Sequence, residues 1–374
     1  MKTVVIAGYA RSPFTPAKKG ALTTVRPDDL AAATVRALIE RSKVRPEDIE
    51  DLILGCAFPE GEQGLNMARL VALNAGLPLT VGGQTINRFC GSSMQSIHAA
   101  AGAIQMGAGE VFVCAGVESM SRVPMMGYNP LPNPALYAAN PGAYIGMGDT
   151  AENVAREWGI SRAEQEAFAV ESHKKAAAAQ AAGRLADEIV AIGAVREDGC
   201  VRADTTAESL AGLKPAFSEQ GSVTAGTSSP LTDGASATLV CSLDYAEKHG
   251  LEPLAKIASI AISGCRPDIM GIGPVGASTK ALARAGISVA DLGVVELNEA
   301  FAAQAIACIR DLKIPSEIIN LDGGAIALGH PLGATGARIT GKAAALLKRE
   351  GKRYALASQC IGGGQGIATV LEAL

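Results

Sequence analysis

VRPEDIEDLILG at residues 44–55 and ISVADLGVVELN at residues 287–298 are two similar stretches that lie far apart in the chain. Each follows a helical pattern and leads through a turn containing aspartate into an apolar run typical of a buried strand. A second pair, GAGEVFVCAGVES at 107–119 and EGKRYALASQCIGGG at 350–364, also shows corresponding helix, strand and glycine turn patterns. Internal repeats of this kind indicate an architecture built from related units. The sequence therefore predicts two similar α/β halves.

Further segments carry the patterns of strands and helices. Residues 27–42 and 91–106 each place apolar side chains on one helical face, so both are predicted to be amphipathic helices packed on a sheet. Apolar runs predict strands at 4–7, 51–55, 111–115, 294–297, 318–321 and 354–359.

The middle of the chain differs from the rest in amino-acid composition. Prolines and asparagines crowd residues 124–141, and an alanine-rich helical stretch at 161–182 is followed by polar turns. This pattern predicts a loop domain inserted into the repeated core. The predicted domains are an N-terminal half at 1–119, completed by 251–265 or a nearby segment, a loop domain at 120–250 and a C-terminal half at 266–374.

Composition and charge narrow the class of protein. The chain has 374 residues, with 33 basic and 37 acidic side chains and a formal net charge of −4, and neither sign forms a long block. This distribution argues against a surface for nucleic acid or for an anionic membrane.

The N-terminal MKTVVIAGYARSP reads as a first strand rather than a signal peptide, and no apolar run is long enough to span a membrane. A cytoplasmic protein is predicted.

One of the eight cysteines has distinctive surroundings. The cysteines are scattered and form no CxxC pair, which argues against a disulfide framework and a structural zinc site. In INRFCGSSMQ at 86–95, however, Cys90 stands where a strand-like run gives way to a helix. Backbone N–H groups and the helix dipole at such a terminus favour a thiolate and can bind an oxyanion. Cys90 is thus a candidate nucleophile, and a buried structural cysteine is the alternative.

A second segment, GGAIALGHPLGATGAR at 323–338, surrounds His330 with glycines. Glycine lets the backbone approach another group closely, and a histidine titrates near neutral pH. His330 is therefore a candidate general base, with a structural histidine as the alternative.

Two more segments carry polar groups at the ends of strands. In QCIGGGQG at 359–366, Cys360 is followed by glycines whose N–H groups can act as donors. In LNEAFAAQA at 297–305, Asn298 and Glu299 lie at a junction between a strand and a helix. They could cap the helix or bind a polar ligand.

Taken in order, these four motifs resemble those of the thiolase family, and the resemblance covers nearly the whole chain. It implies the thiolase fold: two similar βαβαβ-type halves in a five-layered α-β-α-β-α core, with an inserted loop domain. It also implies an acyltransferase acting on CoA thioesters. Coenzyme A is then a substrate, and neither a metal nor a tightly bound cofactor is implied.

The resemblance also implies a role for each motif residue. Cys90 would accept the acyl group, His330 would activate it as a base, and Cys360 would exchange a proton with the leaving carbanion. Asn298 would hold a water that forms one oxyanion hole together with His330. The backbone amides of Cys90 and Gly362 would form the other.

Matches in and beside the loop domain imply a site for coenzyme A. Arg202 aligns with an arginine that lies against the adenine, and Ser229 with a serine that meets the pantetheine arm. Met147 and Phe301 would line the acyl channel.

Details of the motifs favour a degradative 3-ketoacyl-CoA thiolase of β-oxidation. Many biosynthetic thiolases carry a histidine where this chain has Gly146. A biosynthetic acetyl-CoA acetyltransferase, which condenses two acetyl-CoA molecules, remains the alternative, and a non-catalytic acyl-CoA carrier would not need both Cys90 and Cys360. The expected assembly is a homodimer or homotetramer, and a multifunctional β-oxidation protein is a candidate partner.

Overall fold

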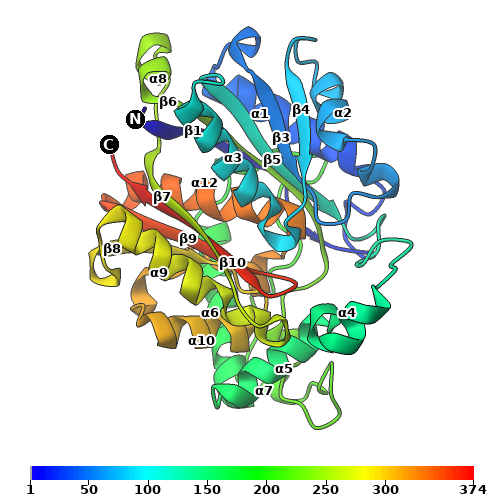
Figure 1. The fold of residues 1–374 in the computed structure, drawn as a ribbon. Helices are drawn as coiled ribbons and strands as arrows, with labels where there is room; N and C mark the ends of the chain where they lie inside the picture. The colour runs from blue at the N-terminus through cyan, green and yellow to red at the C-terminus, as the bar shows by residue number, and fades with distance from the viewer. Residues whose placement is uncertain (1) are drawn as a thin grey trace.

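The computed structural model describes residues 2–374 as a mixed α/β protein (Figure 1). Within these residues, one sheet follows the order β4-β3-β5-β6-β1-β7-β10-β9-β8, and a short tenth strand, β2, pairs with β6. The strands are β1 (Val4–Arg11), β2 (Thr15–Pro16), β3 (Asp51–Gly55), β4 (Gly82–Ile86), β5 (Val111–Ser119), β6 (Thr232–Ser242), β7 (Ala255–Gly264), β8 (Leu292–Leu297), β9 (Tyr354–Ile361) and β10 (Gln365–Glu372).

The pairing of strands repeats in the two halves of this sheet. In the first half, β3 pairs in parallel with β5, which is followed by antiparallel β6 and β1. In the second half, β8 pairs in parallel with β9, which is followed by antiparallel β10 and β7. Strands β3 and β8 end the similar stretches at 44–55 and 287–298, and β5 and β9 lie in the second pair. The predicted architecture of two similar α/β halves is confirmed.

Helices form layers on both outer faces of the sheet and between its halves. The outer helices α1 and α2 cover the first half, and α9 and α10 cover the second. Helices α3 and α12 lie between the halves, where α12 contacts β5 and β6 on one side and β8 and β9 on the other (Figure 1). The helices are α1 (Pro27–Ser42), α2 (Met67–Asn74), α3 (Ser92–Met106), α4 (Pro134–Ala139), α5 (Met147–Glu157), α6 (Arg162–Ala181), α7 (Ala207–Ala211), α8 (Leu243–His249), α9 (Gly273–Ala285), α10 (Ala302–Leu312), α11 (Ala325–Leu328) and α12 (Leu332–Glu350).

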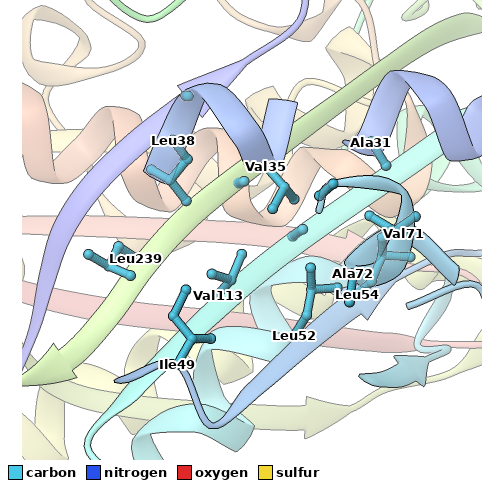
Figure 2. Close-up of a cluster of buried hydrophobic side chains, with 14 of the residues drawn as sticks. Ala31, Val35, Leu38, Ile49, Leu52, Leu54, Val71, Ala72, Val113 and Leu239 are labelled. Atoms are coloured by element: carbon cyan, nitrogen blue, oxygen red, sulfur yellow. The ribbon is translucent and has the colours of Figure 1, made fainter. Parts of the chain in front are cut away.

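The predicted helix at 27–42 is confirmed as α1, and its apolar face forms part of the largest buried cluster. Figure 2 shows Val35 and Leu38 of α1 above Leu52 of β3, Val113 of β5 and Leu239 of β6, all with no exposed surface. Burying a side chain of this size stabilises the fold by about 1.5–3 kcal/mol. This core supports the strands from which the loops of the site extend.

The two halves of the sheet meet at a short junction. Strand β1 pairs with β6 over most of its length, but it pairs with β7 only at Val5 with Lys256 and at Ile6 with Ala255. The helices between the halves therefore supply most of the contact that joins them.

The inserted segment between β5 and β6 contains helices α4 to α7 and lies at one end of the core (Figure 1). We call residues 120–231 the lobe. Residues 232–242, which the sequence analysis placed in the loop domain, instead form β6 between β5 and β1. The sequence signal was weak because β6 is buried on both faces and is made largely of small residues.

The predicted strand at 318–321 was wrong. Only one isolated bridge, between Val295 and Ile319, occurs there, and Asn320 has a positive φ of 44°. The Asn320 side chain accepts from the Leu297 N–H and donates to the Leu297 carbonyl, each at 2.9 Å. A side-chain amide thus makes the hydrogen bonds that a strand backbone would make at the edge of β8.

Candidate active site

Cys90 lies in a short 3-10 turn between β4 and α3, packed against β9. A Cβ atom on Gly91 would meet the Cδ1 atom of Ile361 at 2.6 Å, so a larger residue would push the turn away from the strand. The side chain of Gln359 also donates a hydrogen bond to the carbonyl oxygen of Cys90. Both contacts hold Cys90 beside the strand that carries Cys360.

Burial controls the protonation of the Cys90 thiol, which is only 7% exposed. It raises the pKa of Cys90 from 9.0 to about 11, while hydrogen bonds from the backbone N–H groups of Gly362 and Cys90 itself lower it. The two N–H groups thus favour the thiolate, as expected at a helix N-terminus, but desolvation outweighs them. Cys90 therefore needs a base, although the same two N–H groups face its sulfur.

The Cys360 thiol lies close to Cys90 and has no exposed surface. Its pKa is raised well above the usual value, first by burial and then by the negative charge that Cys90 carries when ionised. A thiol in this state is protonated at neutral pH and can act as a proton donor. Two thiols are thus held together as neutral groups in an apolar site.

His330 lies in the turn between α11 and α12, directly before Pro331, the N-cap of α12. Its backbone N–H donates to Thr232 Oγ1 at 3.0 Å, and its Nδ1 lies 2.7 Å from Thr335 Oγ1. Burial, and then the positive charge of Arg338, lower the pKa of His330 to about 3. The imidazole is therefore neutral at physiological pH, and one of its ring nitrogens carries a free lone pair.

Asn298 lies beside His330, directly after β8. Its Nδ2 atom is 3.5 Å from His330 Nδ1 and 3.4 Å from His330 Nε2. The Asn298 side chain is fully buried, and its Oδ1 atom has no hydrogen-bond partner among the described residues. An unpartnered buried acceptor next to the histidine fits a site that holds a water or a polar substrate group.

Helix capping does not explain Asn298 or Glu299. The N-cap of α10 is Phe301, which makes no side-chain cap hydrogen bond. Glu299 instead accepts hydrogen bonds from the Ser172 hydroxyl at 2.6 Å and from Asn320 Nδ2 at 2.7 Å. Glu299 therefore ties the lobe to the loop after β8, which leaves Asn298 to face the site.

Sequence reasoning missed Glu118, a buried carboxylate at the end of β5. It accepts hydrogen bonds from the backbone N–H of Ala57 at 2.8 Å and of Gly333 at 2.9 Å, and from Gln63 Nε2 at 2.8 Å. Burial raises the pKa of Glu118, while these donors lower it. Glu118 stands inside an apolar strand pattern, so only its three-dimensional neighbours mark it as important.

Apolar side chains from both parts of the molecule surround Cys360. Met147, at the start of α5 in the lobe, and Phe301, before α10, belong to the same hydrophobic cluster as Cys360. A Cβ atom on Gly362 would contact the Met147 sulfur at 3.4 Å, and the Phe217 ring packs edge-on against Phe301 at 5.9 Å between centroids. The structure thus places both predicted channel residues beside the thiols.

The two residues predicted to meet coenzyme A lie on the lobe. The N–H and the hydroxyl of Ser229 both donate to the carbonyl oxygen of Ala300 at 3.0 Å, next to Phe301. Arg202 has an exposed side chain, and its backbone N–H donates to His173 Nδ1 at 3.2 Å. Arg202, His173 and Ser228 line a small cavity.

The structure brings most of the predicted site residues together in two groups. Cys90, Cys360 and Gly362 meet around the thiols, and Asn298 meets His330. Leu332, which follows His330 by two residues, packs in the same apolar cluster as Cys90. Arg202 belongs to the outer, lobe side of the site.

Residues 2–374 include neither a candidate metal site nor a candidate membrane-spanning helix. No group of three or more His, Cys, Asp or Glu side chains in this range is arranged to hold a metal ion. None of the helices in the same range is both long and apolar enough to cross a membrane.

Comparison with known proteins gives a consistent result over the whole chain. Residues 4–244 match the thiolase N-terminal domain, and residues 251–373 match the thiolase C-terminal domain. The chain is 48% identical to a 3-ketoacyl-CoA thiolase of Bacillus subtilis and 49% identical to one of Shewanella frigidimarina, with all of each chain covered. It is also 49% identical to a 3-ketoacyl-CoA thiolase of a Marinomonas species, covering 99% of this chain and 98% of that one. The protein therefore belongs to the thiolase family and is an acyltransferase.

Proposed function

We propose that this enzyme cleaves 3-ketoacyl-CoA with coenzyme A, giving acetyl-CoA and a shortened acyl-CoA through an acyl-Cys90 intermediate. The observation that carries the proposal is the pair of neutral thiols, Cys90 and Cys360, with the Gly362 N–H facing the first. Carbon–carbon cleavage needs a nucleophile and a separate acid, and two neighbouring thiols supply both. The relatives named 3-ketoacyl-CoA thiolase support the same reaction.

In the first half-reaction, the Cys90 sulfur attacks the 3-keto carbon while its proton passes to His330. The oxyanion that forms is stabilised by the protonated His330 and by a water on Asn298, whose Oδ1 is buried without a partner. The bond between carbons 2 and 3 then breaks, and the electron pair takes the proton of Cys360. Acetyl-CoA leaves, and the shortened acyl group stays on Cys90 as a thioester.

In the second half-reaction, the thiol of a second coenzyme A gives its proton back to Cys360 and attacks the thioester. The Cys90 and Gly362 N–H groups, which face the sulfur, are placed to stabilise the oxyanion on this carbonyl. Collapse of the intermediate releases the acyl-CoA, and His330 returns its proton to Cys90. Cys90, His330 and Cys360 therefore end the cycle in the protonation states in which they began it.

The coenzyme A moiety is proposed to lie along the lobe. Ser229 lies against the loop that carries Phe301, and exposed Arg202 lies farther out beside the small cavity. A thioester bound in this direction would reach Cys90 past Met147 and Phe301, which pack with Cys360. Arg202 and Ser229 would then bind parts of the substrate that do not react.

Two measurements test the proposal. Incubation with a 3-ketoacyl-CoA in the absence of free coenzyme A, followed by peptide mass spectrometry, is expected to show an acyl group on Cys90. An active enzyme acylated only at another cysteine would contradict it.

Steady-state thiolysis over increasing chain lengths, beside acetyl-CoA condensation, separates degradation from biosynthesis. If only acetoacetyl-CoA reacts, the biosynthetic alternative replaces the degradative one.

Several features inferred from sequence remain part of this proposal. They are the cytoplasmic location, the homodimer or homotetramer, the multifunctional β-oxidation partner, the absence of a tightly bound cofactor and the division of the chain into two halves and a loop domain. Size measurements in solution and purification from the source cell test the assembly and its partners.

A further inference from the structure

Thr335 makes a close contact with the ring of His330. It lies in the first turn of α12 and has no exposed surface. Its Oγ1 atom is 2.7 Å from His330 Nδ1 and 3.2 Å from the carbonyl oxygen of Pro331, four residues earlier. Threonines inside helices commonly donate to that carbonyl. Because a hydroxyl has only one proton, a Thr335 that donates to Pro331 can only accept at Nδ1.

The other polar neighbours of His330 do not select between its two ring nitrogens. Asn298 Nδ2 lies at nearly equal distances from them, 3.5 Å and 3.4 Å, which are long for hydrogen bonds. Thr232 accepts from the backbone N–H of His330 and so positions the residue without touching the ring. Thr335 is therefore the side chain that binds one ring nitrogen at short range.

We propose that Thr335 is a positioning residue that holds neutral His330 as the tautomer with its proton on Nδ1. Nε2 then has a free lone pair and can take the proton of Cys90. After the transfer, the new Nε2–H donates to the oxyanion, while the Nδ1–H stays on Thr335. When the acyl group leaves Cys90, the Nε2 proton returns to the sulfur. Nε2 thus acts first as the base and then as a hydrogen-bond donor, because Nδ1 stays hydrogen-bonded to Thr335.

This inference rests on the proposed function, since it needs His330 to be the base for Cys90. It requires an imidazole that is neutral before the reaction, as the low pKa of about 3 indicates. It gives a role to Thr335 within the motif: the residue five positions after the histidine must offer a hydroxyl oxygen. Serine can meet this requirement, whereas valine, which has nearly the same shape as threonine, cannot.

Nuclear magnetic resonance of the full-length protein labelled with ¹⁵N-histidine tests the tautomer directly. The His330 signals are assigned by their loss in His330→Asn. At neutral pH we expect a protonated Nδ1 and an unprotonated Nε2. A protonated Nε2 with an unprotonated Nδ1 would overturn the proposal, because Thr335 would then be the donor. The same spectrum of Thr335→Val is expected to show loss of the single Nδ1–H form.

Kinetics of three variants test the consequence for the reaction. Thr335→Val is expected to slow acylation of Cys90 at least about tenfold, as for the loss of roughly one good hydrogen bond, with KM unchanged. Thr335→Ser is expected to restore most of the rate. Thr340→Val is the matched control, because Thr340 is equally buried on α12 and donates to the Gly336 carbonyl at 2.7 Å without touching the site.

Each result of these measurements has a defined meaning. If Thr335→Val acylates as fast as the wild type, or no more slowly than Thr340→Val, Thr335 is only structural and the proposal fails. If Thr335→Val does not fold, the serine variant and the wild-type spectrum still decide. If the wild type forms no acyl-Cys90, the proposed function fails, whichever tautomer the spectrum shows.

Discussion

Glu118 accepts a hydrogen bond from the backbone N–H of Gly333 at 2.9 Å and so joins the end of β5 to the first turn of α12. The same carboxylate holds the N–H of Ala57 after β3. The loop beside Cys90 and the helix that begins next to His330 are therefore fixed to one buried group. Their relative position depends on a side chain that does not react.

Replacing Glu118 with glutamine should destabilise the protein. The glutamine NH₂ group cannot accept from the N–H donors that now surround the carboxylate. We expect the free energy of unfolding to fall by about 2 kcal/mol, the range for hydrogen bonds to a charged group. Chemical denaturation measures it. Glu110→Gln, at an exposed ion pair with Lys2, is the control and should change little; equal effects of both changes would argue against a special role for Glu118.

The reaction of Cys90 with a small neutral alkylating reagent should rise steadily with pH. The thiolate is the reactive form, and burial sets the pKa of Cys90 at about 11. The thiolate fraction therefore increases about tenfold for each pH unit between pH 7 and pH 9. Peptide mass spectrometry separates Cys90 from the partly exposed Cys265. A rate that levels off below pH 8 would mean that the enzyme holds a preformed thiolate.

Replacement of Cys90 and replacement of Cys360, the two cysteines proposed to act in catalysis, should impair different steps. Cys90→Ala should lose both acylation and turnover. Cys360→Ala should retain some acylation by acetyl-CoA, since that half-reaction forms no carbanion and coenzyme A can leave as a thiolate without the Cys360 proton. Its cleavage rate should fall by about 10²–10⁴-fold. Exchange of the acetyl-CoA methyl protons with deuterated water is the sharper measurement. Wild-type exchange in Cys360→Ala would assign that proton transfer to His330 or another group.

Removing the Arg202 side chain should weaken binding of coenzyme A without slowing the chemical step. The guanidinium is exposed on the lobe, away from the thiols, so any contact that it makes is the same in the ground state and the transition state. KM should therefore rise and kcat should stay near its original value in Arg202→Ala. Arg196→Ala, at another exposed arginine of the lobe, should leave both unchanged. A large fall in kcat alone would place Arg202 in the chemistry.

Gly146 should influence the length of the acyl chain that fits. It directly precedes Met147, whose sulfur approaches Gly362, and its backbone conformation suits any residue. A Cβ atom there meets only the end of the flexible Asp149 side chain at 2.8 Å. Gly146→His should therefore fold and reduce thiolysis of medium-chain substrates relative to acetoacetyl-CoA. Gly146→Ala should keep the original preference; an unchanged preference in Gly146→His would place the acyl chain elsewhere.

The repeated α/β architecture and most of the site could be predicted from local sequence. The helix at 27–42 starts with Pro27 at its first turn and ends at Lys43 in the left-handed conformation, and its apolar spacing marks it clearly. Cys90 and His330 stand in turns between predictable elements, and Cys360 stands near the end of β9, just before three consecutive glycines. Local pattern and tertiary structure agree at these positions, so a single sequence is sufficient to find them.

Other features depend on neighbours that are distant in sequence. β6 is a central strand of small residues, so its identity comes from α1 on one face and α12 on the other. Asn320 lies in an apolar run that resembles a strand. Only the structure shows that its side chain accepts a hydrogen bond from the backbone N–H of Leu297. The protonation of Cys90 likewise depends on burial, which a helix-terminus argument does not contain. The spacing of apolar residues along the chain therefore does not predict these contacts between distant residues.

The place of β1 at the centre of the sheet constrains how this chain folds as it is synthesised. Its two neighbours are β6, which begins at Thr232, and β7, which begins at Ala255. Strand β1 therefore waits for both of its neighbours until residues 232–264 have been synthesised. Pairings this distant in sequence form slowly and leave strand edges exposed in the meantime. The exposed edges of β1 are consequently open to pairing with other chains during synthesis.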